Sequence, residues 1–210
     1  MVLTLKSISR KINKELFDEK VPIRYEKESE KIDQNPIVSF VCVSDFERKM
    51  YENLDESNQK EFISKSEYIC IQVMNIEKLY KMYHVGISYD YIGTINMIRK
   101  VVAVDKDNEK LLFALFLILH EFGHWNDFVS KGRKPYVYTQ DKEERKKLYD
   151  FKLKILNDES LYYLSQYKVK ERVREYFNRY NSLPSEKSAN EYAISKLCDV
   201  YRILKEGECI

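Results

Sequence analysis

The stretch Leu111-Leu112-Phe113-Ala114-Leu115-Phe116-Leu117-Ile118-Leu119-His120-Glu121-Phe122-Gly123-His124 decides the fold of this chain. Its first nine residues are apolar without interruption, so a helix formed here is apolar nearly all round and belongs in the centre of a core. Asp105, Asp107 and Asn108 precede the run as candidate N-caps, and Gly132 follows it as a candidate C-cap. The sequence therefore predicts one buried central helix over about residues 108–131.

The end of this stretch reads HEFGH and matches the H-E-x-x-H pattern of zinc hydrolases. A four-residue step on a helix goes about 40° past one full turn, so His120 and His124 project from one face. Two imidazoles on one face can bind a single Zn²⁺ at roughly 2.0–2.1 Å each. Glu121 lies about 100° round from His120, which places its carboxylate beside the metal as a base rather than on it as a ligand. Because the chain has only 3 histidines, this register favours a metal site over a core helix that carries two histidines by chance.

Composition places the chain among soluble globular proteins. Hydrophobic residues make up 44% of its 210 residues and aromatic residues 13%, which is enough for a sizeable core. The net charge of +2 gives no general electrostatic case for binding nucleic acid or an anionic membrane. Charge runs such as Lys142 to Lys147 mix both signs and are typical of a solvated helix face. No Gly/Pro/Ser-rich linker divides the chain, so we expect one domain over residues 1–210.

The cysteines and the N-terminal segment indicate a cytoplasmic protein. Cys42, Cys70, Cys198 and Cys209 form no C-x-x-C pair, and we expect reduced thiols of which the first three are at least partly buried. Basic residues interrupt the apolar residues of the first 14 positions, so no signal-peptide core is expected there. The longest apolar run, of nine residues, is too short to span a bilayer.

Strands are expected early in the chain and helices late, which is an α+β pattern. β-Branched runs predict strands over about residues 37–43, 68–74 and 101–104, and the last of these leads into the motif helix. Helical spacing of apolar residues predicts helices over about 3–18, 45–66 and 76–83, and mostly helical structure after Gly132. The final helix is expected over about 185–205, after a break at Asn181 to Ser185.

A third zinc ligand is required, because a catalytic zinc usually takes three protein ligands. The pattern H-E-x-x-H-x-x-G-x-x-H would supply it directly, but it requires Gly and His where this chain has Asp127 and Ser130. His84, the remaining histidine, precedes the motif helix and is more simply an ordinary partly exposed side chain. The third ligand is therefore sought in the last helix.

Glu186 is the predicted third ligand. The apolar stripe of the last helix consists of Ala189, Ala193, Leu197, Val200 and Leu204. At 100° per residue, Glu186 falls on the centre of this stripe, whereas Glu191 falls about 140° away. A carboxylate on a buried stripe requires a partner, and a metal is one that suffices. A first-turn Glu186 that faces water, and Glu191 as the ligand, are the alternatives.

HEFGH together with Glu186-Lys187-Ser188-Ala189-Asn190-Glu191-Tyr192-Ala193, which reads E-x-x-A-N-x-Y-A, resembles the glutamate-type zincin metallopeptidases, most closely the ImmA/IrrE-like group. The resemblance covers about residues 85–200 in layout. It implies a small mixed sheet of about three or four strands packed on the HExxH helix, with Glu186 as the third ligand. It also implies a helical insertion over about residues 133–181. In such proteins an edge strand holds the extended peptide, and residues 101–104 are the expected counterpart.

The primary hypothesis is a zinc-dependent metallopeptidase with one Zn²⁺ per chain, in which Glu121 is the general base. Its ligands would be His120, His124 and Glu186, although the residues do not exclude Mn²⁺ or Fe²⁺. The resemblance implies a cytoplasmic regulatory protease whose polypeptide substrate is a repressor-type protein. The oligomeric state is left open. Four residues are candidates for the donor to the oxyanion: Tyr192, Tyr136, Tyr138 and His84.

Two other hypotheses belong to different classes. The chain would be an inactive zincin-fold regulatory or binding protein if its zinc is structural, and Asp127 is a conceivable fourth ligand in that case. It would be an interaction module without metal if the helix merely matches the pattern. Metal analysis separates the second hypothesis from the others, and hydrolysis of a polypeptide separates the peptidase from the inactive protein.

Overall fold

A computed structural model describes residues 3–27, 37–42, 55–58, 61, 66–85, 89–133, 142–157 and 166–206 of the chain. The fold is α+β and mostly helical with a small mixed sheet, as predicted. The helices are α1 (Leu5–Phe17), α4 (Ile76–Val85), α5 (Tyr89–Ile98), α6 (Glu109–Ser130), α8 (Lys142–Asn157), α9 (Gln166–Ser182) and α10 (Pro184–Glu206). The strands are β1 (Ile23–Glu26), β2 (Val38–Val41) and β3 (Tyr68–Gln72).

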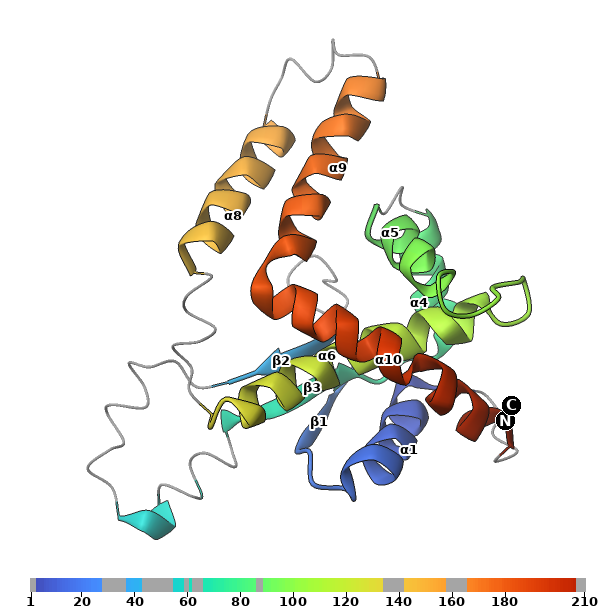
Figure 1. The fold of residues 1–210 in the computed structure, drawn as a ribbon, viewed down its shortest axis with the longest axis vertical. Helices are drawn as coiled ribbons and strands as arrows, with labels where there is room; N and C mark the ends of the chain where they lie inside the picture. The colour runs from blue at the N-terminus through green and yellow to red at the C-terminus, as the bar shows by residue number, and fades with distance from the viewer. Residues whose placement is uncertain are drawn as a thin grey trace.

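Helix α6 is the centre of the molecule, as its apolar run predicts. It contacts α1, α4, α5, α10 and two strands of the sheet (Figure 1). Residues 111–116 of α6 are all buried, so the first turns of the helix are surrounded by the core. The helix ends where Gly132 takes a positive φ of 70°, and the N–H of Arg133 donates to the carbonyl of Phe128 over 2.9 Å. This is the left-handed C-terminal turn that the glycine predicts.

The sheet has the strand order β1-β3-β2. β3 lies in the middle, pairing in parallel with β1 and antiparallel with β2. Ile69 and Ile71 of β3 are fully buried, which explains why this strand is the most apolar of the three. β2 lies at one edge and contacts α6, so an edge of the sheet runs beside the HEFGH motif.

Residues 101–104 are not a strand, and that prediction is wrong. After α5 the chain turns, with the N–H groups of Val101 and Val102 both donating to the carbonyl of Ile98. Val102 and Val104 pack against the core while Val101 is exposed, so the side chains fill space without strand pairing of the backbone. The first strand is instead β1, whose sequence Ile-Arg-Tyr-Glu carries little β signal and which forms by pairing with β3.

The other predicted elements have mixed outcomes. The helices expected over 3–18, 76–83 and 185–205 correspond to α1, α4 and α10, and the strands over 37–43 and 68–74 to β2 and β3. α5 was not anticipated, because its sequence is rich in β-branched residues and contains Gly93. The helix expected over 45–66 lies largely outside the described residues, of which 56–58 are helical. No helix in the described ranges is long and apolar enough to cross a membrane.

The cysteine predictions hold in part. Among the described residues Cys42, Cys70 and Cys198 are thiols that form no disulfide; Cys70 is buried and Cys42 partly buried. Cys198 is exposed, contrary to expectation. It follows the buried Leu197 directly, and a one-residue step turns it about 100° away from the apolar stripe of α10. Cys209 lies outside the described residues.

Small residues let α10 cross closely over α6 (Figure 1). Ala189 and Ala193, which belong to the predicted apolar stripe, are fully buried at this crossing. Gly123, inside the HEFGH motif, is the matching residue on α6. A Cβ added at Gly123 would lie 2.9 Å from both the Cα and the carbonyl oxygen of Ala189. The backbone of α10 therefore occupies the space that any side chain at Gly123 would need.

Gly123→Ala is expected to destabilise the protein, because the clash falls on backbone that cannot swing away. Gly93→Ala is the matched control, since nothing lies within 4 Å of a Cβ added at that helical glycine. Replacing glycine by alanine gains about 1 kcal/mol of helix propensity at either position. The difference in unfolding free energy between the two variants therefore measures the effect of the clash alone. We expect Gly123→Ala to be less stable than Gly93→Ala by about 1–3 kcal/mol in urea unfolding. Equal unfolding midpoints would show that the crossing is not tight.

Helices α8 and α9 pack against each other as a hairpin that projects from the rest of the molecule (Figure 1). The base of the hairpin returns to the core, since α9 contacts both α5 and α10. These two helices fall within the segment expected to be a helical insertion. The hairpin therefore lies next to the crossing of α6 and α10.

Candidate metal centre

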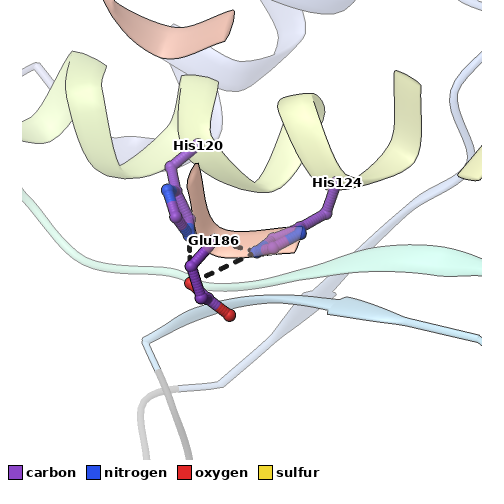
Figure 2. A group of neighbouring side chains, drawn as sticks. All are labelled: His120, His124 and Glu186. Atoms are coloured by element: carbon purple, nitrogen blue, oxygen red, sulfur yellow. Dashed lines mark hydrogen bonds and ion pairs between the residues drawn. The ribbon is translucent and has the colours of Figure 1, made fainter. Parts of the chain in front are cut away.

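His120, His124 and Glu186 converge from two helices, the histidines from α6 and the glutamate from α10 (Figure 2). The Nε2 atoms of the two histidines lie 3.1 Å apart. Oε2 of Glu186 lies 3.2 Å from Nε2 of His120 and 3.6 Å from Nε2 of His124. Among the described residues, these three form the only group of histidine, cysteine, aspartate or glutamate side chains close enough to share one metal ion.

The three separations suit a zinc ion. Ligands arranged tetrahedrally at about 2.0–2.1 Å from zinc lie about 3.3–3.4 Å from one another. The observed separations of 3.1, 3.2 and 3.6 Å bracket that value. Two imidazoles and one carboxylate are also a ligand set typical of catalytic zinc. The residues thus fit a zinc ion in both chemistry and spacing.

Glu186 is a buried carboxylate, with its side chain only 2% exposed. Its Oε1 accepts a hydrogen bond of 2.6 Å from Arg145 of α8, whereas its Oε2 accepts none from a described residue and faces the two histidines. Burial opposes ionisation of the carboxyl, but its interactions with His120 and His124 outweigh burial and hold the pKa of Glu186 well below its usual value. Glu186 is therefore a charged side chain with one oxygen directed at a possible metal.

The ring of His120 is oriented by Asn190, one turn after Glu186 on α10. Nδ1 of His120 lies 2.9 Å from Oδ1 of Asn190, an oxygen that can only accept. Nδ1 therefore carries a proton, so in the neutral imidazole the lone pair is on Nε2, the nitrogen that lies 3.2 Å from Glu186. An amide or carboxylate oxygen in this position commonly fixes the tautomer of a metal-binding histidine.

Glu121 points away from the ligand group toward the edge of the sheet. Its Oε2 accepts a hydrogen bond of 2.6 Å from the backbone N–H of Phe40 in β2. Burial raises the pKa of Glu121, and the nearby charges of His120 and His124 only partly offset that effect. Glu121 is therefore a stronger base than an exposed glutamate, and its carboxylate is held by β2 and not by the ligand group.

A pocket of about 690 Å³ opens beside these residues, and both His120 and Glu121 line it. Its walls come from α5, α6 and α9, and Val38 of β2 lies at its edge. Tyr180 of α9 also lines it. Burial, followed by the charge of Glu186, raises the pKa of Tyr180 far above its usual value, so the phenol keeps its proton. The pocket thus joins a possible metal site, a base and a phenolic donor.

The structure brings three of the predicted site residues together, His120, His124 and Glu186. Glu121 lines the pocket with His120, and its carboxylate is hydrogen-bonded to the backbone N–H of Phe40. Glu191, the alternative ligand, is exposed and lies 3.9 Å from Lys187. Asp127 pairs with Lys131 over 2.6 Å and is not a member of the ligand group.

Most of the proposed oxyanion donors cannot be assigned to the site. Tyr192 packs against Phe17, with ring centroids 6.4 Å apart, and does not line the pocket. Tyr136, Tyr138 and the side chain of His84 lie outside the described part of the chain. Tyr180, which does line the pocket, was not singled out in the sequence.

Sequence reasoning also missed Arg145 and Asn190. Arg145 lies in the mixed-charge run that was interpreted as a solvated face, yet its guanidinium reaches both Glu186 and Ser185. No local pattern distinguishes it from the neighbouring basic residues. Asn190 did carry a signal, because it follows Glu186 by four positions and so shares its helix face.

Comparison of the chain with models of protein families, with curated proteins and with solved structures found no match in any of the three. The geometry of the site is therefore the basis for any functional statement.

Proposed function

We propose that the chain is a zinc-dependent metallopeptidase of the glutamate-type zincin class, in which His120, His124 and Glu186 hold the metal. The observation that carries the proposal is the spacing of the three ligand atoms, at 3.1, 3.2 and 3.6 Å from one another. Glu121, whose pKa is raised by burial, follows His120 directly, and both residues line a pocket. A zincin-like fold belongs to the same proposal, supported by the packing of the HEFGH helix between the sheet and the helix of the third ligand.

The proposed reaction is hydrolysis of a peptide bond by water. The chemistry that zinc supplies is Lewis acidity, which lowers the pKa of water toward about 7 and polarises a carbonyl. Glu121 accepts the proton of the attacking water and passes it to the leaving amine. Asn190 keeps His120 in the tautomer that presents a lone pair. Tyr180, which stays protonated, is the phenol in the pocket that can donate to the developing negative charge.

β2 is the strand that can hold an extended substrate. In an antiparallel pair, alternate residues turn their N–H and C=O groups away from the partner strand. Phe40 is such a residue, since its N–H reaches Glu121 rather than β3. Val38, two residues earlier, therefore also turns its backbone groups outward, and its side chain lines the pocket. A peptide that pairs with Val38 would lie beside the pocket that His120 and Glu121 also line.

The proposal is tested by digestion of a reduced, unfolded polypeptide with the zinc-loaded protein. We expect new N-termini to appear, to be abolished by 1,10-phenanthroline, and to reappear when zinc is restored. If the protein binds zinc but cleaves no polypeptide, the result would favour the alternative hypothesis, an inactive regulatory or binding protein with a structural zinc. Following the resemblance described above, a cytoplasmic repressor-type protein is the proposed physiological substrate.

Arg145→Ala is expected to weaken zinc binding by about 10–100-fold, the usual cost of removing a group that orients a metal ligand. Without Arg145, Oε1 of Glu186 loses its 2.6 Å partner and the carboxylate is free to rotate. Arg145→Lys should restore part of the affinity, because lysine keeps the charge but not the planar fork. Competition with a chromophoric chelator measures the zinc affinity of both Arg145 variants.

Lys147→Ala is the matched control for this prediction. Lys147 lies on the same helix, is exposed and pairs only with Glu144 among the described residues. Its variant should bind zinc as the wild type does. If Arg145→Ala bound zinc equally tightly, the ion pair with Glu186 would have no role in the metal site.

A further inference from the structure

The pocket beside the proposed zinc site has a chemical character of its own. Aromatic residues line the pocket on two sides. Phe113 and Phe116 of α6, which are almost fully buried, line one side, and Phe177 of α9 forms part of the opposite wall. The ring of Phe116 stacks on that of His120, with centroids 6.2 Å apart. A volume of about 690 Å³ lies within the range of roughly 300–1,000 Å³ that is usual for ligand sites. An apolar group bound there would lie next to the reacting atoms.

Gly93 of α5 keeps this pocket wide. It lies in the middle of a helix, where glycine costs about 1 kcal/mol relative to alanine. Its φ is not positive, and a Cβ added to it would meet nothing within 4 Å. Neither backbone conformation nor packing therefore requires a glycine here. The missing side chain instead leaves room in the pocket that Gly93 lines.

The charges that line the pocket are mostly positive. Lys100, just after α5, and Arg174 of α9 line it from opposite walls, and both are exposed. Neither forms an ion pair with any residue in the described ranges. Among the described residues that line the pocket, Glu121, the proposed base, is the single carboxylate. The rim is therefore complementary to a carboxylate.

We propose that this pocket selects the substrate: it binds a large apolar side chain, preferably aromatic, adjacent to the scissile bond and flanked by an acidic residue. The inference rests on the proposed peptidase function and adds its substrate class. Aromatic side chains suit a pocket lined by the rings of Phe113, Phe116 and Phe177. Lys100 and Arg174 would meet the flanking carboxylate, and Gly93 sets how large a side chain can enter.

The test uses amino-acid hydroxamates, which chelate zinc and place one side chain beside it. Binding of phenylalanine hydroxamate and alanine hydroxamate to zinc-loaded protein is measured by calorimetry. We expect the wild type to bind the phenylalanine compound about 10–100-fold more tightly, the gain from burying a phenyl group. In Gly93→Leu, which fills the pocket, this ratio should fall close to one while zinc content stays the same.

Val101→Leu is the matched control, since it adds bulk at an exposed position that does not line the pocket. It should keep the wild-type ratio. The charge component is tested with aspartyl-phenylalanine and asparaginyl-phenylalanine hydroxamates. The aspartyl compound should bind a few-fold more tightly at low salt, and Lys100→Gln/Arg174→Gln should abolish that difference.

The outcomes separate the two levels of the proposal. Equal affinity of the phenylalanine and alanine compounds for the wild type, or an unchanged ratio in Gly93→Leu, overturns the inference and leaves the metal site standing. A protein that takes up no zinc and binds neither hydroxamate overturns the proposed function, and the inference falls with it.

Discussion

Glu121→Gln is expected to keep zinc and to lower peptide hydrolysis by about 10²–10⁴-fold, the usual contribution of a general base. Glutamine has the shape of glutamate, and its amide oxygen can still accept the 2.6 Å hydrogen bond from Phe40. The edge strand and the helix therefore stay in place while the basic oxygen is lost. The measurement compares the rate of substrate cleavage by both proteins at equal zinc content.

Matching zinc content is the essential control for this variant. Equal zinc with a large loss of rate assigns a chemical role to Glu121, because the metal site is then intact. Zinc lost together with activity would assign it a structural role instead. Full activity in Glu121→Gln would contradict its role as the base.

Glu186→Ala is expected to lower zinc affinity by more than about 100-fold, beyond the loss typical of groups that only orient a ligand. The change removes a metal-facing oxygen that lies 3.2 and 3.6 Å from the two histidine Nε2 atoms. It also leaves the guanidinium of Arg145 without its carboxylate partner. Zinc affinity is measured by chelator competition, with circular dichroism as a check that the variant folds.

Glu191→Ala is the matched control for Glu186→Ala. It removes a carboxylate from the same helix, at the exposed position that the sequence left as an alternative ligand. We expect Glu191→Ala to bind zinc as the wild type does. If zinc were lost from Glu191→Ala and retained by Glu186→Ala, the assignment of the third ligand would be reversed.

The site could be predicted from the sequence because helix geometry alone determines most of it. The histidines share a face of α6 by their spacing, and Glu186 falls on the buried stripe of α10 by counting 100° per residue. Both helices have strong apolar patterns, so their burial followed from the residues themselves. The close crossing depends on the small Ala189 and Ala193 of that stripe, and Gly123 of α6 is in tight contact with Ala189.

The features that the sequence did not predict correctly have a common physical cause. Each of them depends on contacts between residues far apart in the sequence. Arg145 became part of the site only because the α8–α9 hairpin brings its guanidinium to Glu186, 41 positions away along the chain. β1 has a weak strand sequence and owes its conformation to β3. Residues 101–104 have a strong strand sequence but pair with none of the strands in the described part of the chain. Local sequence patterns therefore predicted the strongly amphipathic or apolar helices and the strands β2 and β3, but they missed α5 and β1 and wrongly predicted a strand over 101–104.

The central claim is most directly tested by the zinc content of the purified wild-type protein. Mass spectrometry of the metals, after incubation with zinc and dialysis, should give about one zinc per chain. That result would support a site made by His120, His124 and Glu186. A protein that holds no zinc under these conditions would contradict the account and leave HEFGH as the sequence of a core helix.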